Sequence, residues 1–225
     1  MANLMKLEWR KLKQASVIRE LVIYWVILMF LPVFFIKMVS ADFGQSVDAL
    51  FTLILSVQVG FVLLGASLIS QVFIDEFKNK TIALSYSYPI SRKQLFLSKV
   101  LFIGIFIFLA TLISFVLTVV TTMVIDEIFS VLHVGITSSD IWGYVGDMIA
   151  RSFLVTLISF IPLFYLAIWK RAVIPTVICA ILVMQLPNFS PIFNLNQDLV
   201  IVILSILGAI SIYFSIKFAE IIGEI

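Results

Sequence analysis

The sequence has very few of the side chains that enzymes use for chemistry. Of its 225 residues, one is cysteine, one is histidine and only 12% are charged. Cys179 therefore cannot form a disulfide within the chain, and His133 has no second histidine with which to hold a metal ion. The sequence also lacks a Gly-rich loop ending in Gly-Lys-Ser/Thr for nucleotide phosphates, and a His-Glu-x-x-His zinc motif. We expect a chain that is not an enzyme, with no catalytic residue, metal site or cofactor.

A strong charge of either sign is absent as well. The formal net charge is +2, and the basic residues are divided among separate segments instead of forming one stripe. Nucleic-acid binding needs such a basic patch, so we exclude it. Ionisable side chains are also almost missing from the long apolar runs. A proton-coupled carrier would need buried carboxylates or histidines there, so the energy for any transport must come from a partner.

Apolar residues are what the sequence has in abundance. They make up 62% of the chain, and the mean hydropathy is +1.19. A water-soluble domain of this size could not place so many apolar residues away from water. The 21 phenylalanines and the moderate numbers of Gly and Pro suit lipid-facing helices better than a β-barrel. The sequence therefore predicts an all-α polytopic membrane protein, with residues 1–225 forming one transmembrane domain.

Six apolar runs are long enough to cross a membrane, which takes roughly 20 residues for a helix. They cover residues 20–40, 49–74, 100–125, 148–169, 172–188 and 199–216. Pro187 and Pro191 predict a tight turn between the last two runs, because proline donates no hydrogen bond and restricts the residue before it. The fifth and sixth spans should then form an antiparallel hairpin.

The basic residues predict how the spans are oriented. With the N-terminus inside, every Lys and Arg except Lys37 and Arg151 falls on the cytoplasmic side, while acidic residues such as Asp126 gather outside. Basic residues in short loops resist translocation. We therefore expect a multi-pass protein of the bacterial cell membrane with both termini in the cytoplasm.

Residues 2–19 are expected to form an amphipathic helix in the membrane interface. Its two faces carry apolar residues and basic residues respectively: Met5, Trp9 and Leu12 on one, and Lys6, Arg10 and Lys13 on the other. Such a helix can place its apolar face among lipid headgroups and its cations against anionic lipid. A plain positive-inside anchor for the first span is the simpler interpretation, and the two are compatible.

The long inward-facing connection, residues 75–99, is the segment most suited to meeting a cytoplasmic partner. It reads DEFKNKTIALSYSYPISRKQLFLSK, with mixed charge, several apolar and tyrosine side chains, and a break at Pro89. Ser91 and Gln94 have the spacing of a capping box, which predicts a helix from Arg92 through Lys99 into the third span.

With these pieces the chain resembles the permease subunits of the type-2 ABC exporter superfamily. The likeness is strongest to the small six-span permeases of bacterial peptide-export and antibiotic self-protection systems. It rests on the basic N-terminal helix, the six-span layout and a short motif after the second span: Glu76, Lys80-Thr81, Pro89-Ile90-Ser91-Arg92 and Ser98-Lys99. Lys80 stands where such permeases usually have Gly.

The resemblance implies that residues 75–99 are a coupling segment that presses against a separate ATP-hydrolysing subunit. The residues expected to take part are Glu76, Lys78, Thr81, Leu84, Tyr86, Pro89, Arg92 and Lys99. Physical reasoning favours the same segment, because motion of an ATPase reaches the spans only through a cytoplasmic element continuous with a membrane helix. An ordinary solvated charged loop is the alternative.

The function expected from all of this is the permease of an ABC exporter. It would move an amphipathic cargo, such as a peptide, an antibiotic or a lipid-like molecule, with ATP hydrolysed by a partner. The expected partners are two copies of an ABC ATPase, a second permease copy or paralogue, and membrane lipid. A non-transporting scaffold or sensor subunit that recruits a cytoplasmic partner is the alternative.

Two patterns within the spans predict packing contacts. Small and hydroxyl residues recur at every fourth position on three spans: Thr52, Ser56 and Gly60; Ala110, Ser114, Thr118 and Thr122; Ala172, Thr176 and Ala180. Such stripes favour close helix packing over the lining of a pathway. Arg151 lies one helical turn from Asp147, which predicts a local ion pair.

Overall fold

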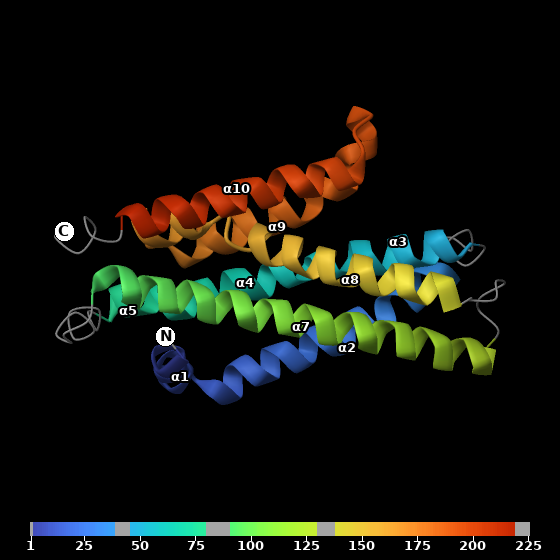
Figure 1. Ribbon diagram of the computed structural model, residues 1–225, viewed down its shortest axis with the longest axis horizontal. Coiled ribbons are helices and arrows are strands. Elements are labelled where there is room, and N and C mark those ends of the chain that lie inside the picture. The colour runs from blue at the N-terminus through green and yellow to red at the C-terminus, as the bar shows by residue number, and fades with distance from the viewer. Residues whose placement is uncertain (1, 39–45, 80–90, 130–137, 219–225) are drawn as a thin grey trace.

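The fold is a bundle of helices that run along one common axis (Figure 1). The computed structural model describes residues 2–38, 46–79, 91–129 and 138–218, and every regular element in these ranges is helical. Five helices are long and apolar enough to cross a membrane, and the apolar helix Val173–Phe189 is shorter. The predicted all-α polytopic membrane fold is confirmed.

The elements follow the chain in a simple order. The N-terminal segment forms α1 (Ala2–Lys11), and the first span is α2 (Gln14–Met38). The second span consists of α3 (Val47–Val57), the 3₁₀ turn η2 (Gln58–Gly60), α4 (Phe61–Ile69), the π-helical η3 (Ser70–Ile74) and α5 (Asp75–Lys78). The third span is α7 (Arg92–Phe129), and the fourth is α8 (Ser138–Ile158) with the π-helical η4 (Leu163–Trp169). The last two spans are α9 (Val173–Phe189), which is followed by the 3₁₀ turn η5 (Ser190–Phe193), and α10 (Gln197–Phe218).

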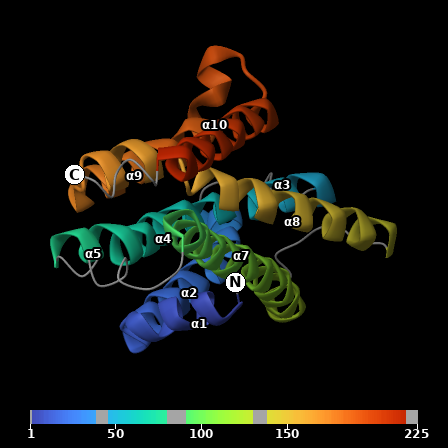
Figure 2. The same cartoon turned by 60° about the vertical axis from the view of Figure 1, so that its left-hand side comes forward.

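The helices form three groups across the bundle. In both views α9 and α10 lie on one side and α1 and α2 on the other, with α4, α7 and α8 between them (Figures 1 and 2). Buried apolar residues such as Phe61, Ile103 and Ile158 fill the space between these central helices. Large apolar side chains remain exposed on the outer faces, for example Phe30 at 48% and Ile206 at 53%. Exposed apolar faces of this kind are expected where lipid surrounds a bundle.

The N-terminal segment differs from the single helix expected over residues 2–19. It bends after Lys11, because α1 ends there and α2 begins at Gln14. The Gln14 side chain donates to the Trp9 carbonyl at 3.3 Å, which supports the bend. Figure 1 shows α1 nearly end-on while α2 runs along the bundle, so α1 lies across its end.

The start of the third span is as predicted. The Gln94 backbone N–H donates to Ser91 Oγ at 3.3 Å, and α7 begins at Arg92. Ser91 thus satisfies one of the backbone donors that every helix start leaves unpaired. From there α7 continues without a break for 38 residues, which is about 57 Å at 1.5 Å per residue.

Two local predictions were wrong in detail. The turn expected over residues 187–191 begins later, because α9 continues through Pro187 to Phe189, and Ser190 Oγ donates to the Pro187 carbonyl at 2.7 Å. Pro187 has no backbone N–H, so α9 lacks one i→i−4 hydrogen bond in its last turn. Arg151 forms its ion pair with Asp198 at the start of α10 and not with Asp147, since α8 packs directly on α10. The predicted contact between the fifth and sixth spans is confirmed.

The small-residue stripes are buried on two of the three spans. Ser114, Thr118 and Thr176 are all 0% exposed, which confirms the packing interpretation for α7 and α9. On the second span Thr52 is exposed, so that stripe is only partly buried.

A glycine on α10 lets that helix approach α8 closely. A Cβ at Gly208 would overlap the carbonyl oxygen of Leu157 on α8. No residue other than glycine fits there without moving one of the two helices apart.

We predict that Gly208→Ala destabilises the protein by at least about 1–3 kcal/mol, the usual cost of overpacking. The thermal unfolding midpoint in detergent measures this. Gly146→Ala is the matched control, because a Cβ at Gly146 on α8 has no other atom within 4 Å. Equal midpoints for the two variants would contradict the close approach of α8 and α10.

Candidate functional site

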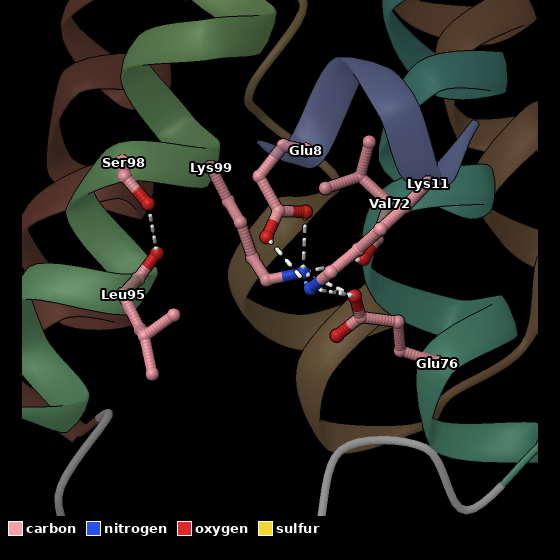
Figure 3. Close-up of polar contacts among 7 residues, drawn as sticks. All are labelled: Glu8, Lys11, Val72, Glu76, Leu95, Ser98 and Lys99. Carbon is pink, nitrogen blue, oxygen red and sulfur yellow. Dashed lines mark hydrogen bonds and ion pairs between the residues drawn. The ribbon is translucent and has the colours of Figure 1, made fainter. Parts of the chain in front are cut away.

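Four charged side chains from three separate elements meet at the end of the bundle where α1 lies. They are Glu8 and Lys11 of α1, Glu76 of α5 and Lys99 of α7, here called the charge cluster (Figure 3). The N-terminal helix α1 is far in sequence from the other two elements, whereas α5 precedes and α7 follows the connection over residues 80–90. The cluster therefore joins both sides of that connection to the N-terminal helix.

Lys99 is at the centre of the charge cluster. Its Nζ lies 3.0 Å from Glu8 Oε2 and 2.8 Å from Glu76 Oε1, and it donates to the Val72 carbonyl at 3.2 Å. An ammonium group has three donors, so these three acceptors match its capacity. The side chains of Lys99 and Glu8 are only 7% and 4% exposed. A buried charge is tolerated only when it is paired and hydrogen-bonded, and here both conditions are met.

Lys11 pairs with both carboxylates on the more exposed side of the charge cluster. Its Nζ lies 3.0 Å from Glu8 Oε1 and 3.3 Å from Glu76 Oε1. Burial of the ammonium opposes its charge, but the hydrogen bonds and the attraction to both carboxylates outweigh burial and raise the pKa of Lys11. Lys11 therefore stays protonated at neutral pH, and two cations balance two anions.

Aromatic rings fix α1 beside the charge cluster. The Trp9 ring stacks on Phe106 with centroids 5.8 Å apart and lies 6.2 Å from the ring of Phe102. Both phenylalanines belong to α7. Lys99 Nζ also lies 5.7 Å from the centroid of the Phe73 ring. Two neighbouring side chains of α1 therefore hold it to α7: Glu8 through its ion pair with Lys99, and Trp9 through its ring contacts.

The residues predicted to couple to an ATPase fall into three sets: those in the charge cluster, those elsewhere in the described structure, and those outside it. Glu76 and Lys99 are in the charge cluster, Lys78 is exposed, and Arg92 begins α7 and is half-buried. Four further residues lie outside the described part of the chain: Thr81, Leu84, Tyr86 and Pro89. The role of all eight residues at an ATPase, Glu76 and Lys99 included, stays a prediction.

The predicted interfacial residues of α1, and Leu12 and Lys13 directly after it, also fall into two sets. Met5, Trp9 and Leu12 are partly buried against the core of the bundle. Arg10 and Lys13 are exposed. The apolar face of α1 is thus turned toward the chain's own helices, and the basic face points away from them.

Sequence reasoning did not identify Glu8 or Lys11 as part of a site. The signal was present, since Glu8 lies three residues after Met5 and four before Leu12, on the face of α1 that is buried. A carboxylate on the apolar face of a helix needs a cation in the fold. The sequence alone could not show that this cation is Lys99, 91 residues away.

Comparison with known proteins identifies a family for this chain. Residues 4–186 match the family described as ABC-2 family transporter protein. The chain is also 32% identical over 218 residues to a protein of Bacillus subtilis (strain 168) named "Uncharacterized protein YcbO". This alignment covers 95% of this chain and 94% of the relative. No solved structure matches the chain. The family match confirms the resemblance drawn from the sequence motifs.

We predict that Glu8→Gln destabilises the protein by about 1.5–3 kcal/mol, the value of a hydrogen bond to a charged group. The loss stays below that of a fully unpaired charge because Glu76 remains beside Lys99. Thermal unfolding in detergent measures it, and Asp147→Asn, the same carboxylate-to-amide change at an exposed position of α8, is the control. A Glu8→Gln midpoint no lower than that of the control would contradict a buried pair.

Proposed function

Since the chain belongs to the ABC-2 transporter family, whose members are membrane permease subunits of ABC transporters, we propose that it is the permease of a bacterial exporter. It moves an amphipathic cargo, such as a peptide, an antibiotic or a lipid-like molecule, and a separate subunit hydrolyses the ATP. The observation that carries the proposal is the charge cluster, which joins the two flanks of the connection over residues 80–90 into one body with α1.

The proposed coupling segment, residues 75–99, transmits force because its ends are rigid. At one end Glu76 is held by Lys99, and at the other α7 continues unbroken from Arg92 across the membrane. An ATPase that presses on the segment moves the second and third spans together, and the Glu8 contact carries α1 with them. Coupling of this kind needs contiguous, well-packed elements between the two sites.

The interior of the bundle supports an amphipathic cargo. Apart from Glu8 and Lys99, the buried polar side chains in the described residues are Gln58 and several serines and threonines. Such groups offer hydrogen bonds without charge and provide no chain of acids or bases for protons. The driving force is therefore ATP hydrolysis by the partner, and the pathway is weakly polar.

A complete transporter contains two permeases and two ATPase subunits. Six spans enclose little space alone, so a second copy of this chain or a paralogue completes the pathway. The N-terminal helix α1 and the last turn of α10 lie at the same end of the bundle (Figure 1). We place this end in the cytoplasm, because the basic residues gather there.

The exposed basic side of α1 suits the anionic lipid of the cytoplasmic leaflet. Lys6, Arg10 and Lys13 are exposed, and Leu7 beside them is 51% exposed. A helix that lies across the end of the bundle presents these groups at headgroup depth, where each cation contributes about 1 kcal/mol of attraction.

We predict that Lys78→Glu weakens the binding of an ABC ATPase about tenfold, which is about 1.4 kcal/mol. The side chain is exposed and lies outside the charge cluster, so membrane insertion and thermal stability stay unchanged. Co-purification with a candidate ATPase and the hydrolysis rate in the presence of cargo measure the effect. Lys217→Glu, at an exposed site in the last turn of α10, is the control. Unchanged ATPase binding by Lys78→Glu would contradict the proposed contact at Lys78. If no ABC ATPase binds the parent chain, a scaffold or sensor function is favoured instead.

We predict that the triple variant Lys6→Gln, Arg10→Gln and Lys13→Gln loses most of the thermal stabilisation that anionic lipid gives to the protein. Vesicles of phosphatidylcholine with and without phosphatidylglycerol provide the comparison. In phosphatidylcholine alone the variant should unfold at the same temperature as the parent. If phosphatidylglycerol raises both midpoints equally, the basic face of α1 does not bind anionic lipid.

A further inference from the structure

The fourth span is interrupted within the bundle. Its first part, α8, ends at Ile158 and its second part, η4, begins at Leu163. Between them the backbone follows a tighter pattern, with Phe160 N–H donating to the Leu157 carbonyl and Ile161 N–H to the Ile158 carbonyl, both at 3.0 Å. Residues 159–162 are here called the joint. Irregular backbone at membrane depth is tolerated only where protein buries it or water reaches it.

Three glycines from three other spans surround the joint. A Cβ at Gly65 of α4 would overlap Ser159, and one at Gly208 of α10 would overlap the Leu157 carbonyl. Gly104 of α7 faces the Phe160 ring, which would lie 3.7 Å from its Cβ. The joint is therefore enclosed by protein, and Ser159 is 0% exposed. Because these positions are glycines, the surrounding helices leave space for the irregular backbone. Larger side chains would fill that space.

One side chain of α10 satisfies backbone groups within the joint and at the start of η4. Ser211 Oγ accepts a hydrogen bond from Phe164 N–H at 3.1 Å and donates one to the Ile161 carbonyl at 3.2 Å. Ser205 on the same helix is different, because its hydroxyl donates to the Val202 carbonyl of its own helix at 2.7 Å. Ser211 thus forms hydrogen bonds from α10 to the fourth span, whereas Ser205 forms its hydrogen bond within α10.

The second part of the fourth span is linked to the charge cluster through another π-helical segment. The π-helical η4 packs against η3 of the second span. The Val72 carbonyl of η3 accepts a hydrogen bond from Lys99. π-Helical turns are rare and recur at functional sites, and here two of them lie in contact on the side that faces the coupling segment.

We propose that residues 159–162 are a hinge about which η4 turns relative to α8, and that Ser211 is the positioning residue that holds the hinge in the observed state. The second part η4 packs on both η3 and α10, so when η3 moves with the coupling segment, η4 moves with it and shifts against α10, while α8 keeps its packing on α10. The hinge rests on the proposed function only for the force that drives it. Whether residues 159–162 bend is a property of this chain and can be measured without an ATPase.

The test measures a distance across the hinge by electron–electron double resonance. Spin labels replace Phe153 and Trp169, which lie on either side of the joint and are 57% and 63% exposed, in a Cys179→Ser background. A second pair on the unbroken α7 replaces Leu109 and Val124, which are each 51% exposed, and serves as the rigid reference. Both pairs are measured in the full chain in lipid nanodiscs without an ATPase.

We expect Ser211→Ala to widen or split the distance distribution across the hinge and to leave the α7 pair unchanged. Ser205→Ala should change neither distribution, and Ser211→Thr, which keeps the hydroxyl, should restore the narrow one. A distribution across the hinge that is the same for Ser211→Ala and Ser205→Ala would overturn the proposal. Thermal unfolding of each variant shows whether it is folded, and a Ser211→Ala chain that does not fold is replaced by Ser211→Gly, which also lacks the hydroxyl and is judged by the same two outcomes.

The hinge and the transport function fail in different ways. A rigid fourth span in a chain that still stimulates an ATPase would overturn the hinge and leave the transport function in place. A distribution that widens as expected in a chain that binds no ATPase would overturn the transport function alone.

Discussion

The burial of the Lys99 ammonium is the constraint on which the account of this protein depends. A cation with a side chain that is 7% exposed cannot remain charged in a membrane bundle without anions beside it. Glu8 and Glu76 supply them, and each comes from a different element. Meeting this one requirement fixes α1 across the end of the bundle and holds the two flanks of residues 80–90 together.

The rest of the bundle combines rigid and interrupted helices around that anchor. The unbroken α7 extends from the charge cluster across the membrane, while the second and fourth spans contain π-helical segments that touch one another. At the opposite end Arg151 of α8 is paired with Asp198 of α10. Charge pairs therefore secure both ends of the bundle, and the irregular backbone lies between them, where glycines and Ser211 accommodate it.

The sequence predicted those features that depend on neighbouring residues. Apolar runs gave the spans, and Ser91 gave the start of α7, because both signals are local. Features that depend on distant partners were not predicted. Arg151 was assigned to Asp147 because α10 could not be placed beside α8. The charge cluster was not predicted, because Glu76 and Lys99 were expected only at an ATPase contact and the partner Glu8 is brought in by the fold.

We propose that the charge cluster transmits ATP-driven motion to the spans, in addition to stabilising the fold. The double variant Glu8→Gln with Lys99→Met separates the two roles, because it leaves no unpaired buried cation and keeps Glu76 beside Lys11. The measurement is the rate of ATP hydrolysis that the permease stimulates in its partner ATPase, taken with the thermal midpoint. We predict a midpoint close to that of the parent and a loss of stimulated hydrolysis. A stable double variant that stimulates hydrolysis as fully as the parent would contradict the account.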